Sequence, residues 1–294
     1  MGKVLPRLIL AVCIFAVMAG CAGEFAPQRV PAKTVRAGDI TIGYKEFGKG
    51  DPLVMIMGYG GMMDLWDPRL VKALALNYRV IMFDNRGIGK TSDPGTEFTI
   101  ELFADDTARL MDALGIKKAH VLGYSMGASV AQELALKYPQ RVSKLVLYAG
   151  DCGGAEAIRP GPDVALQLSD SSVELKERIR RLINLLFPDE WIANNPNISE
   201  YFSMPKELPS AEILTRQIKA MDTWKGSFSR LGSILEPTLL ITGTDDLLTP
   251  PANSRLLLQR IPKAQLIEIA GGGHGVMFQS PEEFSSDVLE FLLE

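Results

Sequence analysis

Residue types that build metal sites and disulfide frameworks are scarce in this sequence. Its 294 residues include three cysteines and two histidines, and no C-x-x-C or H-x-x-x-H spacing occurs. We therefore expect no metal site and no cofactor. Lys plus Arg number 31 against 35 Asp plus Glu, which gives a formal net charge of −4 without long charged blocks. This balance excludes the basic excess typical of nucleic-acid-binding proteins.

The N-terminal hydrophobic run is too short to cross a bilayer. It extends from Leu8 to Met18, about 11 residues, whereas a transmembrane helix needs about 20. Lys3 and Arg7 precede it and small residues follow it, which is the layout of a secretory signal peptide. We therefore expect residues 1–21 to direct export. Residues 22–33, with two prolines and no periodicity, are expected to be a linker.

The end of the expected signal peptide contains a cysteine. The segment Met18-Ala-Gly-Cys21 resembles a bacterial lipobox, in which the cysteine becomes the lipidated first residue of the mature chain. Lipoboxes usually begin with Leu, so Met18 departs from the pattern, and ordinary cleavage nearby is the alternative. Lipidation at Cys21 implies that acyl chains tether an exported protein to the membrane of the bacterial cell envelope. Only Cys152 would then remain, so no intramolecular disulfide is expected.

Continuous apolar runs alternate with helical periodicity along most of the chain. This alternation predicts βαβ units and a mostly parallel central sheet with helices on both faces. The expected strands comprise residues 40–44, 53–57, 79–83, 119–123, 144–148, 237–242 and 264–269. The expected helices comprise residues 67–76, 100–114, 128–137, 251–261 and 281–293. We assign residues 34–150 and 234–294 to one α/β core.

The alternation breaks between residues 151 and 233. Two amphipathic helices are expected there, at 173–187 and 211–225, with proline-rich turns between them. Ligands of open α/β sheets bind at the carboxyl ends of the strands, where this insertion begins. We therefore expect residues 151–233 to form a helical lid over that edge. The alternative is that these helices pack elsewhere on the core.

A G-x-S-x-G motif, Gly123-Tyr-Ser-Met-Gly127, lies between an expected strand and an expected helix. A sharp turn at this place holds the hydroxyl of Ser125 clear of the sheet. The N-terminus of the following helix points backbone N–H groups toward any developing anion. The flanking strand and helix make the short motif a specific signal. Ser125 is therefore the candidate nucleophile.

A nucleophilic serine needs a base, and the chain offers two histidines. His120 begins the strand that leads to Ser125, so it is expected on or below the sheet, making a structural hydrogen bond. His274 lies in the loop Gly271-Gly-Gly-His-Gly275 after the last expected strand. Such loops bring a side chain over the carboxyl edge of the sheet. We therefore expect His274 to be the general base.

The acid that orients the base should follow a strand between the serine and the histidine. Asp245 and Asp246 follow the strand at 237–242. We prefer Asp246, because it fits a G-x-x-D-x-x-x-P pattern from Gly243 to Pro250, and we expect Asp245 to be a solvated turn residue. Asp151, at the end of the preceding strand, is the alternative acid.

An oxyanion hole needs two backbone donors. The N–H of Met126, at the start of the helix after the serine, is the first candidate. The second is the N–H of Tyr59 in the loop Gly58-Tyr-Gly-Gly61, where the glycines allow a substrate to approach the backbone closely. A plain glycine turn is the alternative interpretation.

These motifs together resemble the α/β-hydrolase superfamily from about Thr34 to the C-terminus. The order Ser125, Asp246, His274 is the order of that superfamily. The segment from Asp84 to Ser92 resembles the D-x-R-G-x-G-x-S turn of its lid-bearing branch, which includes cofactor-free haloperoxidases, enol-lactonases and carbon–carbon bond hydrolases. We expect Asp84 and Arg86 to make internal hydrogen bonds in this turn. Two departures are Met57, where many relatives have His, and Ala128, where relatives often have Gly.

The resemblance implies a serine hydrolase that cleaves small carboxylic esters or lactones through an acyl-enzyme. Large apolar residues of the expected lid are candidates to line a pocket for an apolar substrate. The alternative is that they only attach the lid to the core. They are Leu182, Leu185, Leu186, Phe187, Trp191 and Phe202. A carbon–carbon bond hydrolase or a cofactor-free perhydrolase would use the same triad, and a non-catalytic ligand-binding lipoprotein is a further alternative. The oligomeric state does not follow from these patterns.

Overall fold

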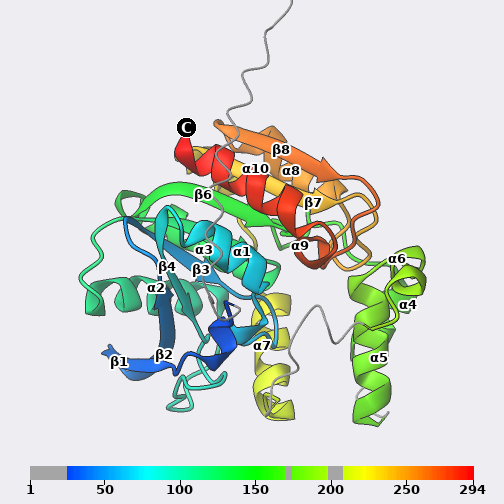
Figure 1. Cartoon of the computed structure of the whole chain (residues 1–294), viewed down its shortest axis with the longest axis horizontal. Coiled ribbons are helices and arrows are strands. Elements are labelled where there is room, and N and C mark those ends of the chain that lie inside the picture. The colour runs from blue at the N-terminus through cyan, green and yellow to red at the C-terminus, as the bar shows by residue number, and fades with distance from the viewer. Residues whose placement is uncertain (1–24, 170–173, 198–207) are drawn as a thin grey trace, which may run out of the picture.

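The computed structural model describes residues 25–169, 174–197 and 208–294 (Figure 1). Its centre is an eight-stranded sheet in the order β1-β2-β4-β3-β5-β6-β7-β8. β1 and β2 are antiparallel to each other, β2 is antiparallel to β4, and all other neighbours are parallel. The strands are β1 (Lys33–Ala37), β2 (Ile40–Phe47), β3 (Asp51–Ile56), β4 (Tyr78–Phe83), β5 (Ala119–Tyr124), β6 (Val142–Tyr148), β7 (Thr238–Gly243) and β8 (Ala264–Ile269). The predicted α/β-hydrolase fold with a mostly parallel sheet is confirmed.

Two hydrophobic layers cover the two faces of the sheet, because successive strand residues point to opposite faces. In β3, Val54 and Ile56 belong to one layer, and Leu53 and Met55 belong to the other. The first layer includes side chains of α2, α3 and α8, and the second includes side chains of α1, α9 and α10. These helices are α1 (Pro68–Leu74), α2 (Ile100–Ala113), α3 (Met126–Lys137), α8 (Ala252–Arg260), α9 (Val276–Gln279) and α10 (Pro281–Leu293).

The chain between β6 and β7 is helical in its described parts. It contains α4 (Pro162–Ser169), α5 (Leu175–Leu186), α6 (Asp189–Asn194), α7 (Ala211–Thr223) and the 3₁₀ helix η5 (Phe228–Ser233). In Figure 1, α4, α5 and α6 lie together at one side of the molecule, apart from α7. We refer to residues 151–233 as the insertion.

The described part of the chain begins at residue 25, inside the expected linker of residues 22–33. Residues Pro27–Arg29 form a short 3₁₀ helix, η1, and the Lys45 ammonium donates to the Pro27 carbonyl at 3.0 Å. The expected signal peptide and Cys21 lie outside the described residues. Within the described part of the chain, no helix combines the length and apolar character that a bilayer-spanning segment needs.

Candidate active site

Ser125 occupies a strained turn between β5 and α3. Its φ of 56° and ψ of −121° lie in a region that non-glycine residues rarely adopt. Close packing enforces this turn. A Cβ on Gly123 would come within 2.3 Å of the Gly127 carbonyl oxygen, and one on Gly127 within 2.1 Å of the Ile56 carbonyl oxygen. The close approach of α3 to β5 and β3 therefore requires glycine at both motif positions.

Asp246 and His274 come together from the ends of β7 and β8. His274 Nδ1 lies 2.8 Å from Asp246 Oδ2, and each residue is only 3% exposed. A carboxylate accepts hydrogen bonds, so the proton of this contact lies on Nδ1 and Nε2 is the basic nitrogen. The other carboxylate oxygen, Oδ1, accepts the backbone N–H groups of Leu248 at 2.9 Å and Thr249 at 2.8 Å. These contacts fix the plane of the carboxylate.

The other candidate acids lie differently. Asp245 is exposed, and its Oδ1 accepts the hydroxyl of the neighbouring Thr244 at 3.1 Å. Asp151 uses its Oδ1 to accept the Gly153 N–H at 2.8 Å. Burial raises the pKa of the Asp151 carboxyl. Of the three carboxylates, the one in contact with the imidazole is that of Asp246.

Aromatic packing connects the histidine loop to the serine turn. The ring of Tyr124, which directly precedes Ser125, lies 5.1 Å from the His274 ring and stacks on Tyr148 at 4.6 Å. The Tyr148 hydroxyl donates to the His274 carbonyl oxygen. Burial raises the pKa of both tyrosines, so their hydroxyls stay neutral at physiological pH. His274 is thus held against the residue next to the candidate nucleophile.

His120 has a packing role on the sheet. Its ring lies edge-on to Tyr78, with 5.4 Å between the ring centres. The hydrogen bond that we expected is not found at Nδ1, which is buried and has no partner among the residues that the structure describes. Burial also lowers the pKa of this imidazole, which favours its neutral form. That expectation is therefore wrong at Nδ1, where ring packing replaces the hydrogen bond.

The loop after β3 lies directly beside Ser125. A Cβ placed on Gly58 would be 3.0 Å from the Ser125 Cβ and 3.6 Å from its Oγ. The Gly61 N–H donates to the Gly58 carbonyl at 3.1 Å and closes a turn around Tyr59 and Gly60. The turn that contains Tyr59 therefore lies next to the serine turn.

Two further features define the backbone on either side of Ser125. The Asn85 side-chain amide donates to the Met57 carbonyl at 3.0 Å and holds the start of the loop. Met126 is the first residue of α3, where backbone N–H groups have no partner within the helix. Both expected oxyanion donors, Tyr59 and Met126, thus belong to the two chain segments that flank the Ser125 side chain.

The turn from Asp84 to Ser92 is held by internal hydrogen bonds, as predicted. The Asp84 carboxylate accepts the N–H groups of Met63 at 2.8 Å and Lys90 at 2.9 Å. Arg86 is buried and forms a two-bond ion pair with Asp106, at 2.6 and 2.8 Å. It also bonds Asp39, and that contact lowers the pKa of the Asp39 carboxyl to about 2. These residues shape the loop next to the site.

The insertion contacts the histidine loop. The Gly275 N–H donates to the Leu186 carbonyl at 2.9 Å, and a Cβ on Gly275 would meet the Phe187 ring at 2.5 Å. Phe187 in turn stacks on Trp191 with 4.6 Å between ring centres. Of the apolar residues expected to line a pocket, Leu185 and Phe187 are buried, whereas Leu182 is 43% exposed. Phe202 lies outside the described residues.

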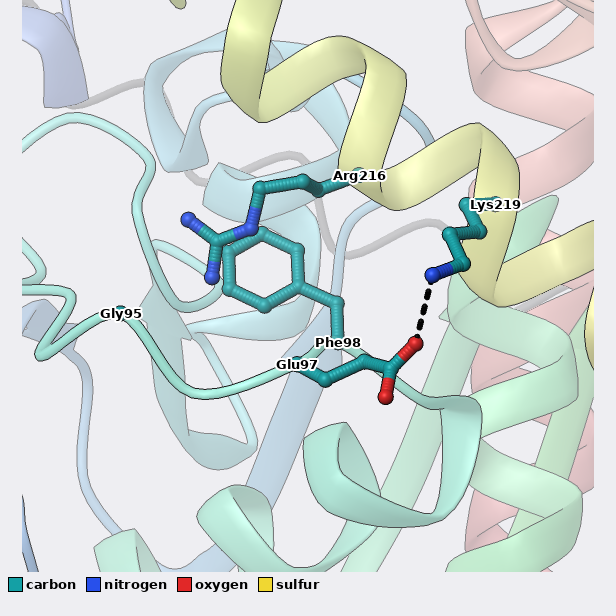
Figure 2. Close-up of a pocket in the computed structure, with 5 residues that line it drawn as sticks. All are labelled: Gly95, Glu97, Phe98, Arg216 and Lys219. Carbon is teal, nitrogen blue, oxygen red and sulfur yellow. Dashed lines mark ion pairs between the residues drawn. The ribbon is translucent and has the colours of Figure 1, made fainter.

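The insertion also contacts the loop after β3, through α7. The Gly60 N–H donates to the side-chain oxygen of Gln217 at 2.8 Å. Figure 2 shows α7 beside the segment that precedes α2, with the Arg216 guanidinium over the Phe98 ring, 3.8 Å from its centre. Lys219 forms an ion pair with Glu97 at 2.7 Å. Sequence reasoning missed Gln217, because nothing in the helical pattern separates it from other polar residues.

A metal centre has no obvious place in the part of the chain that the structure describes. There, no group of three or more His, Cys, Asp or Glu side chains is arranged to hold an ion. Cys152 is a buried thiol whose pKa burial raises to about 11, so it is protonated and unreactive at neutral pH.

Comparison with known proteins identifies the family of this chain. The family model of the alpha/beta hydrolase fold matches residues 51–168 and 217–281, and most of the insertion lies between the two matched ranges. The chain is 32% identical to a protein provisionally named carbamate hydrolase RutD from Azorhizobium caulinodans, over 86% of this chain and 96% of that protein. It is 33% identical to a protein provisionally named non-heme bromoperoxidase BpoC from Mycobacterium tuberculosis, over 86% and 97%. The structure of the meta-cleavage product hydrolase CumD from Pseudomonas fluorescens IP01 matches with a TM-score of 0.76 and 25% identity, over 88% and 97%.

Proposed function

The chain belongs to the alpha/beta hydrolase fold family and is an enzyme of the hydrolase type, and from that premise we propose a serine hydrolase of small carboxylic esters or lactones. The observation that carries the proposal is the buried contact of 2.8 Å between His274 Nδ1 and Asp246 Oδ2, beside the turn that holds Ser125. A buried acid–imidazole pair next to a strained serine is the arrangement that activates a hydroxyl.

In the proposed mechanism, Ser125 Oγ attacks the substrate carbonyl carbon while His274 Nε2 takes the hydroxyl proton. Asp246 holds the Nδ1–H tautomer and stabilises the imidazolium. The backbone N–H groups of Tyr59 and Met126 bind the oxyanion, His274 protonates the leaving alcohol, and an acyl-enzyme remains. Water then attacks the acyl carbonyl, with the same imidazole as base, and releases the acid and Ser125.

We propose that the insertion serves as the lid of this site. Its support is that the insertion contacts both sides of the proposed catalytic centre. Leu186 and Phe187 contact the loop that carries the proposed base, and Gln217 contacts the loop that carries a proposed oxyanion donor. Such a cover limits substrate size and excludes water. The apolar side chains at the end of α5 favour an apolar acyl or alcohol group.

Other reactions use the same three side chains. Cleavage of a carbon–carbon bond and perhydrolysis of acetate are the alternatives, and the names of the relatives add carbamate cleavage. Each begins at a carbonyl carbon and differs in the group that leaves or attacks. The substrate, rather than the triad, separates them.

A substrate panel tests the proposal. Purified protein and Ser125→Ala are assayed with p-nitrophenyl esters from acetyl to lauroyl, with γ- and δ-lactones, with a phenyl carbamate, with a β-diketone, and with acetate plus hydrogen peroxide. We expect ester or lactone turnover by the wild type that disappears in Ser125→Ala. The ester proposal would be rejected if the wild type turned over the β-diketone, the carbamate, or acetate plus hydrogen peroxide, but none of the esters or lactones. Equal ester turnover by Ser125→Ala would reject the nucleophile.

We also propose that the chain is exported and lipid-anchored at Cys21. The support is the sequence alone: a charged start, a short apolar run and a cysteine at the end of the signal layout. Growth of a bacterial host with radioactive palmitate tests this directly. The full chain should incorporate label, and Cys21→Ser should not. Label that persists in Cys21→Ser would contradict the anchor.

A further inference from the structure

The side chain of Gln217 is fixed in orientation by its contact with the loop after β3. Gln217 is fully buried, and its Oε1 accepts the Gly60 N–H at 2.8 Å. A backbone N–H can only donate, so the atom facing Gly60 must be the oxygen. The amide nitrogen, Nε2, therefore has a defined position on the same carbon, beside the turn that contains Tyr59.

This amide nitrogen is a donor without an acceptor. Nε2 has no hydrogen-bond partner among the residues that the structure describes, although it is buried. Folded proteins satisfy most buried donors, because an unpaired one has lost its hydration without compensation. The unpaired N–H of Gln217 is therefore available to a ligand that supplies a hydrogen-bond acceptor.

The helix that carries Gln217 is held on several sides, so the amide is preorganised. The Leu214 side chain packs so tightly on Gly60 that a Cβ there would come within 2.9 Å of it. On the outer side of α7, Arg216 stacks on Phe98 and Lys219 pairs with Glu97 (Figure 2). The amide thus stays in place without a ligand to order it.

We propose that Gln217 recognises a second oxygen of the substrate, and this inference rests on the proposed hydrolase function. Its Nε2–H donates to a neutral acceptor, such as an ether or keto oxygen near the scissile carbonyl, while Oε1 fixes the oxyanion loop through Gly60. A purely hydrocarbon group in that position would leave the buried donor unpaired. The substrate class is therefore an ester or lactone with an additional acceptor oxygen, in either its acyl or its alcohol part.

Matched substrate pairs test the inference with the wild type alone. In the acyl pair, p-nitrophenyl methoxyacetate differs from p-nitrophenyl butyrate by one oxygen in place of a methylene. In the alcohol pair, 2-methoxyethyl acetate differs from butyl acetate in the same way. The ratio of kcat/KM within each pair, divided by the ratio of the alkaline hydrolysis rates, gives the oxygen preference. We expect a preference of about tenfold in one pair, the effect of one buried hydrogen bond.

Variants then assign the preference to the amide. Gln217→Glu, assayed at alkaline pH, keeps an acceptor for Gly60 and removes the amide donor, whereas Gln217→Met removes both. We expect both to lose the oxygen preference, chiefly in KM, and Gln217→Met to lose kcat for every substrate as well. Glu212→Gln, on the same helix and 81% exposed at its side chain, is the control and should keep the wild-type preference. Thermal unfolding midpoints verify that each variant folds.

The outcomes separate this inference from the proposed function. An active wild type that shows no oxygen preference in either substrate pair would overturn the inference and leave the hydrolase function intact. An oxygen preference that Gln217→Glu retains would do the same. A wild type that neither turns over esters nor reacts with a fluorophosphonate probe would overturn both.

Discussion

Replacing Asp246 by Asn should nearly abolish activity for a reason that the contacts of this residue define. Asp246 Oδ1 accepts two backbone N–H groups, and its Oδ2 accepts the His274 Nδ1–H. An Asn side chain has one oxygen, and the two N–H groups require that oxygen to replace Oδ1. The Asn NH₂ then faces His274 Nδ1 as a donor, so Nδ1 must lose its proton. The proton moves to Nε2, the atom that has to accept the hydroxyl proton of Ser125.

The size of this effect follows from the tautomer. Forcing the wrong tautomer in another Ser-His-Asp triad lowers kcat about 10⁴-fold, and we expect a similar loss in Asp246→Asn. This corresponds to about 5.4 kcal/mol of transition-state free energy, since each tenfold change is about 1.36 kcal/mol. The assay is kcat on p-nitrophenyl butyrate, with circular dichroism to verify that the fold persists.

Two controls make the result decisive. Asp245→Asn alters an exposed carboxylate one residue away and should keep kcat within about threefold, as expected of a surface change. Asp151→Asn alters the half-buried alternative acid and should lower kcat far less than Asp246→Asn. A loss of similar size in Asp245→Asn, or a larger loss in Asp151→Asn, would refute the assignment of Asp246.

Three further predictions concern stability. Gly127→Ala should destabilise the fold by about 1–3 kcal/mol or more, because its Cβ would collide with a β3 carbonyl. Gly232→Ala is the control: its Cβ would lie 3.9 Å from the Arg260 carbonyl oxygen, so this variant should be neutral in urea denaturation. Trp224→Phe removes a buried indole N–H bond of 2.7 Å to a carboxylate and should lower the unfolding free energy by about 1–2 kcal/mol; an unchanged urea midpoint would contradict this. Arg86 lowers the pKa of Asp39 to about 2 from 3.8, so the ionised Asp39 stabilises the fold above about pH 3.8, and this contribution is lost as pH falls toward 2. Because the Asp39 side chain is 45% exposed, Asp39→Asn should cost at most about 1 kcal/mol at neutral pH. The difference in urea midpoint should shrink below pH 4, and a constant difference would refute the linkage.

Much of the core could be predicted because its signals are local. Residues 53–56 of β3 form a continuous apolar run, since both faces of the strand are buried there. Helix α2 begins where Thr99 accepts the Leu102 N–H and ends before Gly115, whose φ is +68°. Strand β1 was missed as an element, because it is short and at the sheet edge, and most of its side chains are solvated.

The site was predictable only where sequence order carries geometry. Parallel strands end at one edge, so Asp246 and His274, each just after a strand, could be expected to meet. The choice between Asp245 and Asp246 depended on a spacing pattern. In the structure, the carboxylate that contacts the His274 imidazole is that of Asp246. Gln217 lies 157 residues from Gly60 in the chain. Its importance arises from how α7 packs on the loop, and no local pattern encodes that contact.

The central claim is that the Ser125 hydroxyl is an activated nucleophile, and reaction with a fluorophosphonate probe tests it most directly. The folded wild type should form one covalent adduct, which mass spectrometry of tryptic peptides should locate on Ser125. Heat-denatured protein and Ser125→Ala should form none. An adduct on another residue, labelling of Ser125→Ala at the wild-type rate, or a folded wild type that does not react would contradict the account.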